Sequence, residues 1–252
     1  MIPSVVQKKT ASEDAVYTGM PSTTDPSTFW QPGETFIATN LYNRGEQTPS
    51  LPEGQRLFLR LIPTTPLASS ITNMALLGLA GSGRLIPMLY ASGGWLCERN
   101  KYGVYVYAEA DNRILGFTQL FKTGELWGIN ANCIDKDRLM ASAGVHFGFF
   151  PCGSFERIFA RTLANYLQFA QETLKLLLPL KIKAGATNVE GYRMIAPTGM
   201  HFSSGKFDGR VVDQHITWEG TIEDYAMQPH QILRPFFNHV WDACGLERPD
   251  QE

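Results

Sequence analysis

An apolar stripe between Phe155 and Leu174 constrains the fold more than any other feature of this chain. Large apolar side chains recur there every three or four residues, which is the period of one face of an α-helix. Ser154 is the predicted N-cap, and Glu156 lies in the first turn, where the helix dipole favours a negative charge. A helix of this kind has to bury its apolar face, so the sequence predicts a sheet beneath it. The stripe consists of Phe155, Ile158, Phe159, Leu163, Tyr166, Leu167, Ala170 and Leu174.

The residues before this helix contain the strands for such a sheet. The run from Arg56 to Ile62 is densely apolar and stops at Pro63, which is typical of a buried strand. Residues 102–107 and 114–121 flank a turn at Asp111-Asn112 and predict an antiparallel hairpin. Residues 125–129 add a third strand after a second short turn, giving a meander. Residues 71–79 fit either a short helix or a buried strand.

The elements after the long helix complete the predicted fold. Pro179 is its predicted end, residues 180–185 alternate as a strand does, and residues 211–218 predict another strand. Pro235 is the predicted first-turn residue of a second amphipathic helix that ends at Gly245. We therefore expect an α+β fold over residues 53–246, a largely antiparallel sheet packed against two amphipathic helices, and a polar tail at residues 247–252.

Residues 1–52 have a different composition, rich in Ser, Thr, Pro, Gly and Gln, and predict an extended polar arm. Several apolar side chains interrupt the arm, so we expect part of it to dock on its own domain or on a second subunit. They are Phe29, Trp30, Phe36, Ile37, Leu41 and Tyr42. Because the N-terminus lacks a secretory apolar region and no stretch could span a bilayer, the expected location is the cytoplasm, without membrane association.

Composition excludes several classes of function. Twenty-two basic and 24 acidic side chains give a formal net charge of -2, so the whole molecule does not attract polyphosphate or anionic membranes. The four cysteines form no zinc-site pattern, and buried, reduced thiols are expected. The glycines at 78, 81 and 83 precede Arg84-Leu85 rather than the Lys-Ser/Thr of a phosphate-binding loop. We expect no cofactor and no metal.

Catalytic candidates are few. The five histidines are far apart in sequence, and the Ser-Gly pairs do not match a nucleophile elbow. The pairs Glu109/Asp111 and Asp135/Asp137 are interpreted as turn residues. Glu219, Glu223 and Asp224 form the densest group of carboxylates, and a metal-dependent hydrolase or nuclease would use them to hold Mg²⁺. No residue is assigned a catalytic role.

Cations interleaved with aromatic residues suggest a second kind of site. Basic side chains beside stacking faces on one sheet are a common way of holding single-stranded nucleic acid. The competing interpretation, that alternate strand positions simply face solvent, is favoured by the near-neutral total charge. The candidate nucleic-acid-binding residues are Arg60, Lys101, Tyr102, Lys122, Tyr192 and Arg193.

Several blocks of sequence, in matching order and spacing over about residues 44–246, resemble the C-terminal region of bacterial Schlafen-type proteins. Those proteins carry an N-terminal AlbA-like domain of the DNA-binding or ATP-binding kind. The blocks are Arg56–Pro63, Arg99–Gly103, Gly116–Glu125, Leu163–Leu167, Asn188–Gly191, Ile222–Tyr225, Leu233–Pro235 and Val240–Gly245.

The resemblance implies an accessory module rather than a catalyst. Only about 44 polar residues stand where the AlbA-like domain would be, so no nuclease or ATP-binding residue can be carried over. The resemblance therefore predicts a non-catalytic interaction or regulatory domain, with a protein partner or self-association. A nucleic-acid-binding module is the alternative, and a metal-dependent hydrolase or nuclease is the second alternative. Whether the chain stands alone or belongs to a larger protein stays open.

Overall fold

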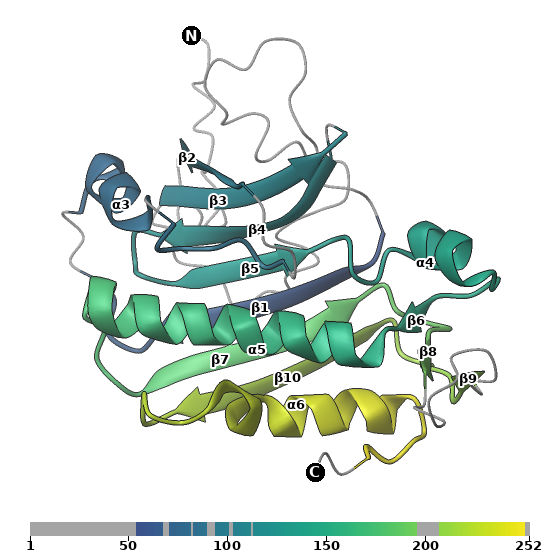
Figure 1. The fold of residues 1–252 in the computed structure, drawn as a ribbon. Helices are drawn as coiled ribbons and strands as arrows, with labels where there is room; N and C mark the ends of the chain where they lie inside the picture. The colour runs from purple at the N-terminus through teal and green to yellow at the C-terminus, as the bar shows by residue number, and fades with distance from the viewer. Residues whose placement is uncertain are drawn as a thin grey trace, which may run out of the picture.

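The computed structural model describes residues 54–67, 71–81, 83–89, 94–100, 103–111, 113–195 and 207–249. It confirms the predicted α+β fold. A seven-stranded antiparallel sheet, in the order β10-β7-β1-β5-β4-β3-β2, has helices packed on one face (Figure 1). The predicted arm, residues 1–52, lies outside the described residues.

The centre of the sheet is β1 (Arg56–Pro63), as its apolar sequence predicts. It pairs with β5 (Leu126–Asn130) on one side and with β7 (Leu180–Thr187) on the other. Leu59 lies opposite Gly128 and Ala184 in these two ladders. All of β1 except Ile62 is buried, because side chains are covered on both faces of the strand.

The remaining strands extend the sheet to either side. The meander contains β2 (Leu96–Asn100), β3 (Gly103–Ala110) and β4 (Arg113–Phe121), and the turn after β3 places Asp111 in the left-handed region at φ 51. The predicted hairpin is thus confirmed. On the other side, β10 (His215–Ile222) pairs with β7. It begins four residues later than predicted, because Val211 is buried in a loop where its N–H donates to the Tyr192 carbonyl.

The long helix α5 (Cys152–Gln168) continues into the π-helical turn η2 (Phe169–Leu174). The whole predicted apolar stripe is buried, which confirms its orientation toward the core. The N-terminal prediction is wrong, since Pro151 is the N-cap and Ser154 already lies within the helix. Glu156 does not lie in the first turn, where the sequence predicts it, and it forms a buried ion pair with Arg248.

Two other helices pack on the same face. Residues 71–79, left undecided by the sequence, form α3 (Asn73–Ala80), in which the Thr72 side chain accepts a hydrogen bond from Ala75 N. The second predicted amphipathic helix is α6 (Pro229–Ala243), which begins six residues before the predicted start. Pro235 lies inside α6 on its exposed side, so the helix continues through it.

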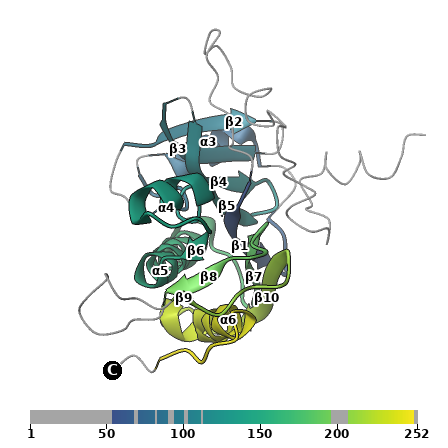
Figure 2. The same ribbon diagram turned by 90° about the vertical axis from the view of Figure 1, so that its right-hand side faces the viewer.

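Four small elements lie at the end of the sheet where β1 begins and β5 ends. Helix α4 (Lys136–Ala143) starts after Asp135, whose side chain accepts from Arg138 N. A separate small sheet contains β6 (Phe149–Phe150), β8 (Arg193–Ile195) and β9 (Phe207–Asp208). Figure 2 shows these short strands beside α4 and α5.

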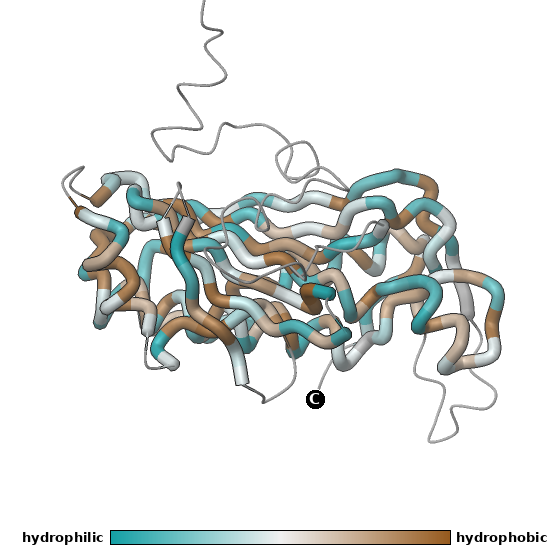
Figure 3. The backbone as a smooth tube through the Cα atoms, turned by 90° about the horizontal axis from the view of Figure 1, so that it is seen from above, coloured by the Kyte–Doolittle hydropathy of each residue, from teal (hydrophilic) through white to brown (hydrophobic). Residues whose placement is uncertain are grey.

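The sheet has an apolar layer on each face. One layer lies between the strands and helices α3, α5 and α6, and the rings of Phe159 and Phe236 meet there at 4.8 Å. The other layer, which we call the aromatic cluster, lies on the opposite face and consists of Phe58, Tyr105, Tyr107, Ile114, Phe117, Phe121, Trp127 and Ile129. Hydrophobic residues accordingly recur along the strands in Figure 3. No helix in the described part of the chain is long and apolar enough to cross a membrane.

Candidate functional site

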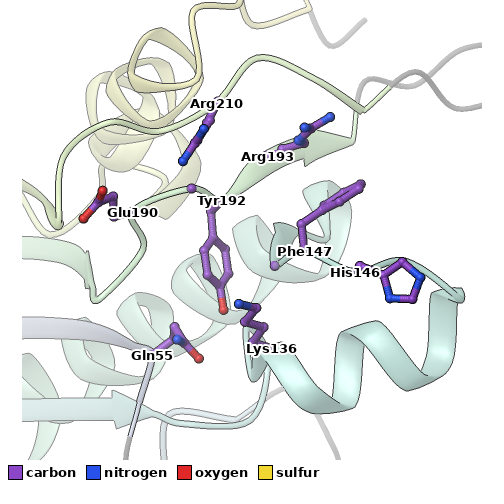
Figure 4. Close-up of a pocket in the computed structure, with 10 residues that line it drawn as sticks. Gln55, Lys136, His146, Phe147, Glu190, Tyr192, Arg193 and Arg210 are labelled. Atoms are coloured by element: carbon purple, nitrogen blue, oxygen red, sulfur yellow. The ribbon is translucent and has the colours of Figure 1, made fainter.

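A pocket of about 310 Å³ lies where the small sheet, the start of α4 and the start of β1 meet. Figure 4 shows its lining side chains, which come from five separate segments of the chain. The lining residues are Gln55, Lys136, His146, Phe147, Gly148, Glu190, Gly191, Tyr192, Arg193 and Arg210.

Backbone hydrogen bonds hold three of these segments together. Arg193 N donates to the Gly148 carbonyl at 3.1 Å, which joins the start of β6 to β8. Gly191 N donates to the Val211 carbonyl at 2.8 Å, which places Arg210 beside this turn. The site is therefore built on paired backbone rather than on a free loop.

Two glycines make this close approach feasible. A Cβ on Gly148 would overlap the ring of Tyr192, so only a residue without a side chain fits there. Gly191 has a φ of +80, a conformation that favours glycine, and a Cβ at this position would lie 3.8 Å from Arg210 Nη2. The pocket thus depends on the absence of a side chain at Gly148 and on the left-handed backbone conformation at Gly191.

The pocket is rich in positive charge. Lys136, Arg193 and Arg210 line it together with His146, and Glu190 is the one acidic residue among its lining residues. The Arg193 guanidinium lies 4.5 Å from the centroid of the Phe147 ring, a cation–π contact that orients it. Among the described residues, neither Lys136 nor Arg210 forms an ion pair or a side-chain hydrogen bond. Both are exposed, so two cations are available to a ligand.

Tyr192 forms a wall of the pocket and is anchored to the backbone through its hydroxyl group. Its hydroxyl donates to the Ile134 carbonyl at 2.7 Å, and the residue is 2% exposed. Burial, together with the charges of Asp135 and Asp137, raises the pKa of Tyr192 well above its usual value. The phenol therefore stays neutral and anchored.

Of the four candidate nucleic-acid-binding residues that the structure describes, it brings two together. Tyr192 and Arg193 are adjacent in the pocket, but Arg60 is 3% exposed and its Nε donates to Glu125 Oε1 at 2.8 Å. Lys122 follows β4 at the opposite end of β1 from Gln55, as the pairing of Leu61 with Leu126 shows. Lys101 and Tyr102 lie outside the described residues.

The predicted group of carboxylates does not form a metal site in the described part of the chain. Glu219 Oε1 forms an ion pair with Lys183 Nζ at 2.6 Å, and this contact lowers the pKa of Glu219. Asp224 Oδ1 accepts from Ala226 N in a local turn. Within the residues that the structure describes, no group of three His, Cys, Asp or Glu residues could hold a metal ion.

Sequence reasoning missed most of the pocket. Lys136, His146 and Arg210 belong to no motif, and they meet only because β6 and β8 pair across more than forty residues of chain. One local feature of the sequence points to the pocket. It is Gly191-Tyr-Arg193, where a glycine is followed by an aromatic residue and a cation.

No protein-family model, no curated protein and no solved structure matches this chain. The resemblance to Schlafen-type proteins therefore stays a prediction.

Proposed function

We propose that this domain is a non-catalytic interaction module whose basic pocket binds an anionic group presented by a protein partner. The observation that carries the proposal is the placement of Lys136 and Arg210, two exposed cations without an ionic partner among the described residues, around one pocket.

A phosphate or carboxylate group fits this chemistry. Arginine offers planar, directional donors to such groups, and lysine adds a compact positive charge. The volume of about 310 Å³ accommodates the group together with the side chain that bears it. Phe147 adds an apolar surface beside Arg193.

The distribution of charge supports a protein partner over a nucleic acid. A single strand is held by a track of cations that follows successive phosphates. Here Arg60 is buried with Glu125, and Lys183 is paired with Glu219, so these cations do not extend the pocket into a track. With a net charge of -2 on the chain, one local anion site is favoured over an extended one. The Schlafen resemblance supports the same class, an accessory interaction domain.

The proposal is tested first with inorganic phosphate, followed by amide NMR shifts of the full chain. We expect saturable shifts at Gly148, Gly191 and Arg193, and a weaker affinity, by about tenfold, in Arg210→Gln, since one charge-assisted contact is lost. Arg84→Gln removes an exposed arginine outside the pocket and is the matched control, with unchanged affinity. If phosphate shifts the amide signals evenly over the surface, or if Arg210→Gln and Arg84→Gln change the affinity equally, the pocket is not the phosphate-binding site.

A second titration separates the two kinds of partner. A peptide bearing one phosphoserine, its unmodified counterpart and a twelve-nucleotide single strand are compared at two salt concentrations. We expect the phosphopeptide to bind more tightly than the unmodified peptide, with a shallow salt dependence. Tighter binding of the oligonucleotide, falling steeply with salt, would replace this proposal with nucleic-acid binding.

A further inference from the structure

Glu190 has a fixed backbone position at the rim of the basic pocket. It is the second residue of a β-turn over residues 189–192, closed by a hydrogen bond of 3.0 Å from Tyr192 N to the Val189 carbonyl. The third residue, Gly191, has the positive φ, 80, that a type II turn requires. Val189 N also donates to the Gln214 carbonyl at 2.9 Å, which attaches the turn to the segment before β10. Paired backbone on both sides therefore holds Glu190 beside the pocket.

The cations of the pocket do not neutralise the Glu190 carboxylate. The residue is exposed, and among the described residues it forms no ion pair and no side-chain hydrogen bond. Arg210 Nη2 lies 3.8 Å from the position of a Cβ on Gly191, the next residue in the chain. Figure 4 shows Glu190 well apart from Arg193 and Lys136. One end of the pocket is thus negative, and the rest of its charged lining is positive.

A carboxylate in a basic pocket discriminates between ligands. It repels a ligand that carries only negative charge, and it attracts the positive part of a ligand that carries both signs. A phosphorylated side chain carries a charge of about −2 at neutral pH and three acceptor oxygens, which suits three cations better than a single carboxylate does. Those cations are Lys136, Arg193 and Arg210. The charges of the pocket therefore match a phosphate group that has a cation next to it.

We propose that the pocket binds a phosphorylated residue that has an arginine or lysine close to it in the partner's sequence, and that Glu190 selects this basic residue. The inference rests on the proposed function, because it assigns the partner's anionic group to a phosphate. The phosphate enters among the three cations, and the basic side chain stays at the rim, where Glu190 is exposed. Neighbouring Cα atoms are about 3.8 Å apart, so a long basic side chain one or two positions away can reach that rim.

Phosphopeptides that differ in one charge test the role of Glu190 in the full chain. Each short peptide carries one phosphoserine and, one or two positions to either side of it, arginine or citrulline. Citrulline has nearly the shape of arginine but no charge. We expect the wild type to bind an arginine peptide about threefold more tightly than its citrulline counterpart, which is the size of one exposed ion pair. In Glu190→Gln this preference should vanish.

Inorganic phosphate should respond to the same variant with the opposite sign. Because Glu190→Gln removes a charge that repels free phosphate, we expect the variant to bind phosphate as tightly as the wild type or more tightly. Damage to the fold would instead weaken the binding of every ligand. Glu223→Gln is the matched control, since Glu223 is exposed, lies outside the pocket and follows the far end of β10. It should keep the wild-type preference for the arginine peptide.

The possible results distinguish this inference from the proposed function. Equal affinities of the wild type for the arginine and citrulline peptides at every position, or a preference that persists in Glu190→Gln, would overturn selection by Glu190 while phosphate binding stands. Failure of inorganic phosphate and of every phosphopeptide to bind would overturn the proposed function and this inference with it.

Discussion

The Arg60–Glu125 ion pair places two buried charges beside the aromatic cluster, where the Arg60 guanidinium also lies 4.8 Å from the centroid of the Trp127 ring. Burial raises the pKa of Glu125 to about 7, and Arg60 opposes that rise. The folded protein therefore holds this proton more tightly than the unfolded chain, whose ordinary value is 4.5. The contribution of Glu125 to stability is full below pH 4.5 and is lost as the pH rises through about 7.

The loss of the Glu125 contribution with rising pH can be measured. The difference in unfolding free energy between wild type and Glu125→Gln, measured in urea, should fall by on the order of 2 kcal/mol between pH 5 and pH 8. A constant difference for Glu125→Gln would show that the carboxylate stays ionised throughout.

The same residues show where sequence reasoning stops. Arg60 looks like a solvent-facing cation in the sequence, because its partner Glu125 lies 65 positions away. Tyr192 looks available for stacking, but its hydroxyl is bound to Ile134, 58 positions away. Alternation along a strand predicts which face a side chain occupies, but not whether another layer buries that face.

At the scale of elements, glycines set how closely β5 approaches the helical layer. A Cβ on Gly128 would overlap the Tyr166 hydroxyl and lie 2.9 Å from Met88 Cβ. That hydroxyl is already hydrogen-bonded to Thr118 at 2.8 Å, so it has little freedom to move. We expect Gly128→Ala to lower the free energy of unfolding by about 1–3 kcal/mol in urea denaturation.

Gly78→Ala is the matched substitution on an open surface. No atom lies within 4 Å of a Cβ at this position in helix α3, so alanine should raise stability by about 0.5–1 kcal/mol through its better helix propensity. A Gly128→Ala variant that is as stable as the wild type, or more stable, would contradict the assignment of Gly128 to a close contact.

Helices and strands whose apolar residues recur at a regular spacing were predictable from the sequence, and elements without such a spacing were not. The apolar stripe of α5 and the hairpin of β3 and β4 follow from spacing alone. Helix α4 has one buried residue, Leu139, and so lacks a stripe that would reveal it. The start of α6 was misplaced because Pro235 reads as a first-turn residue, although a proline on the exposed side of a helix is tolerated when packing holds both halves. The pocket depends on these weakly patterned segments.

At the scale of the whole molecule, one ion pair fastens the end of the described chain to its longest helix. Arg248 donates from Nε and Nη2 to the two carboxylate oxygens of Glu156 at 3.0 and 2.8 Å, and it lies 5.4 Å from the Phe237 ring. Arg248→Met removes both hydrogen bonds that the guanidinium donates to the buried Glu156 carboxylate and should lower the free energy of unfolding by about 3 kcal/mol in urea denaturation.

The double variant Glu156→Gln/Arg248→Met distinguishes the effect of the buried charge on stability from the effect of lost packing. Because it removes the buried charge as well, it should recover part of the loss, and its unfolding free energy should exceed that of Arg248→Met. A double variant less stable than Arg248→Met would show that the Glu156 carboxylate stabilises the fold even without Arg248.

The position of β1 has a consequence for the order in which the protein forms during synthesis. β1 is the first described strand to leave the ribosome, yet Leu59 needs Gly128 on one side and Ala184 on the other. The β2–β5 meander is built from neighbouring segments and can assemble early, whereas the middle of the sheet waits for more than 120 residues of further translation. The nascent chain therefore carries β1 without a partner until β5 is made and with one edge unpaired until β7 is made, so this is the stage at which chaperones have most to protect.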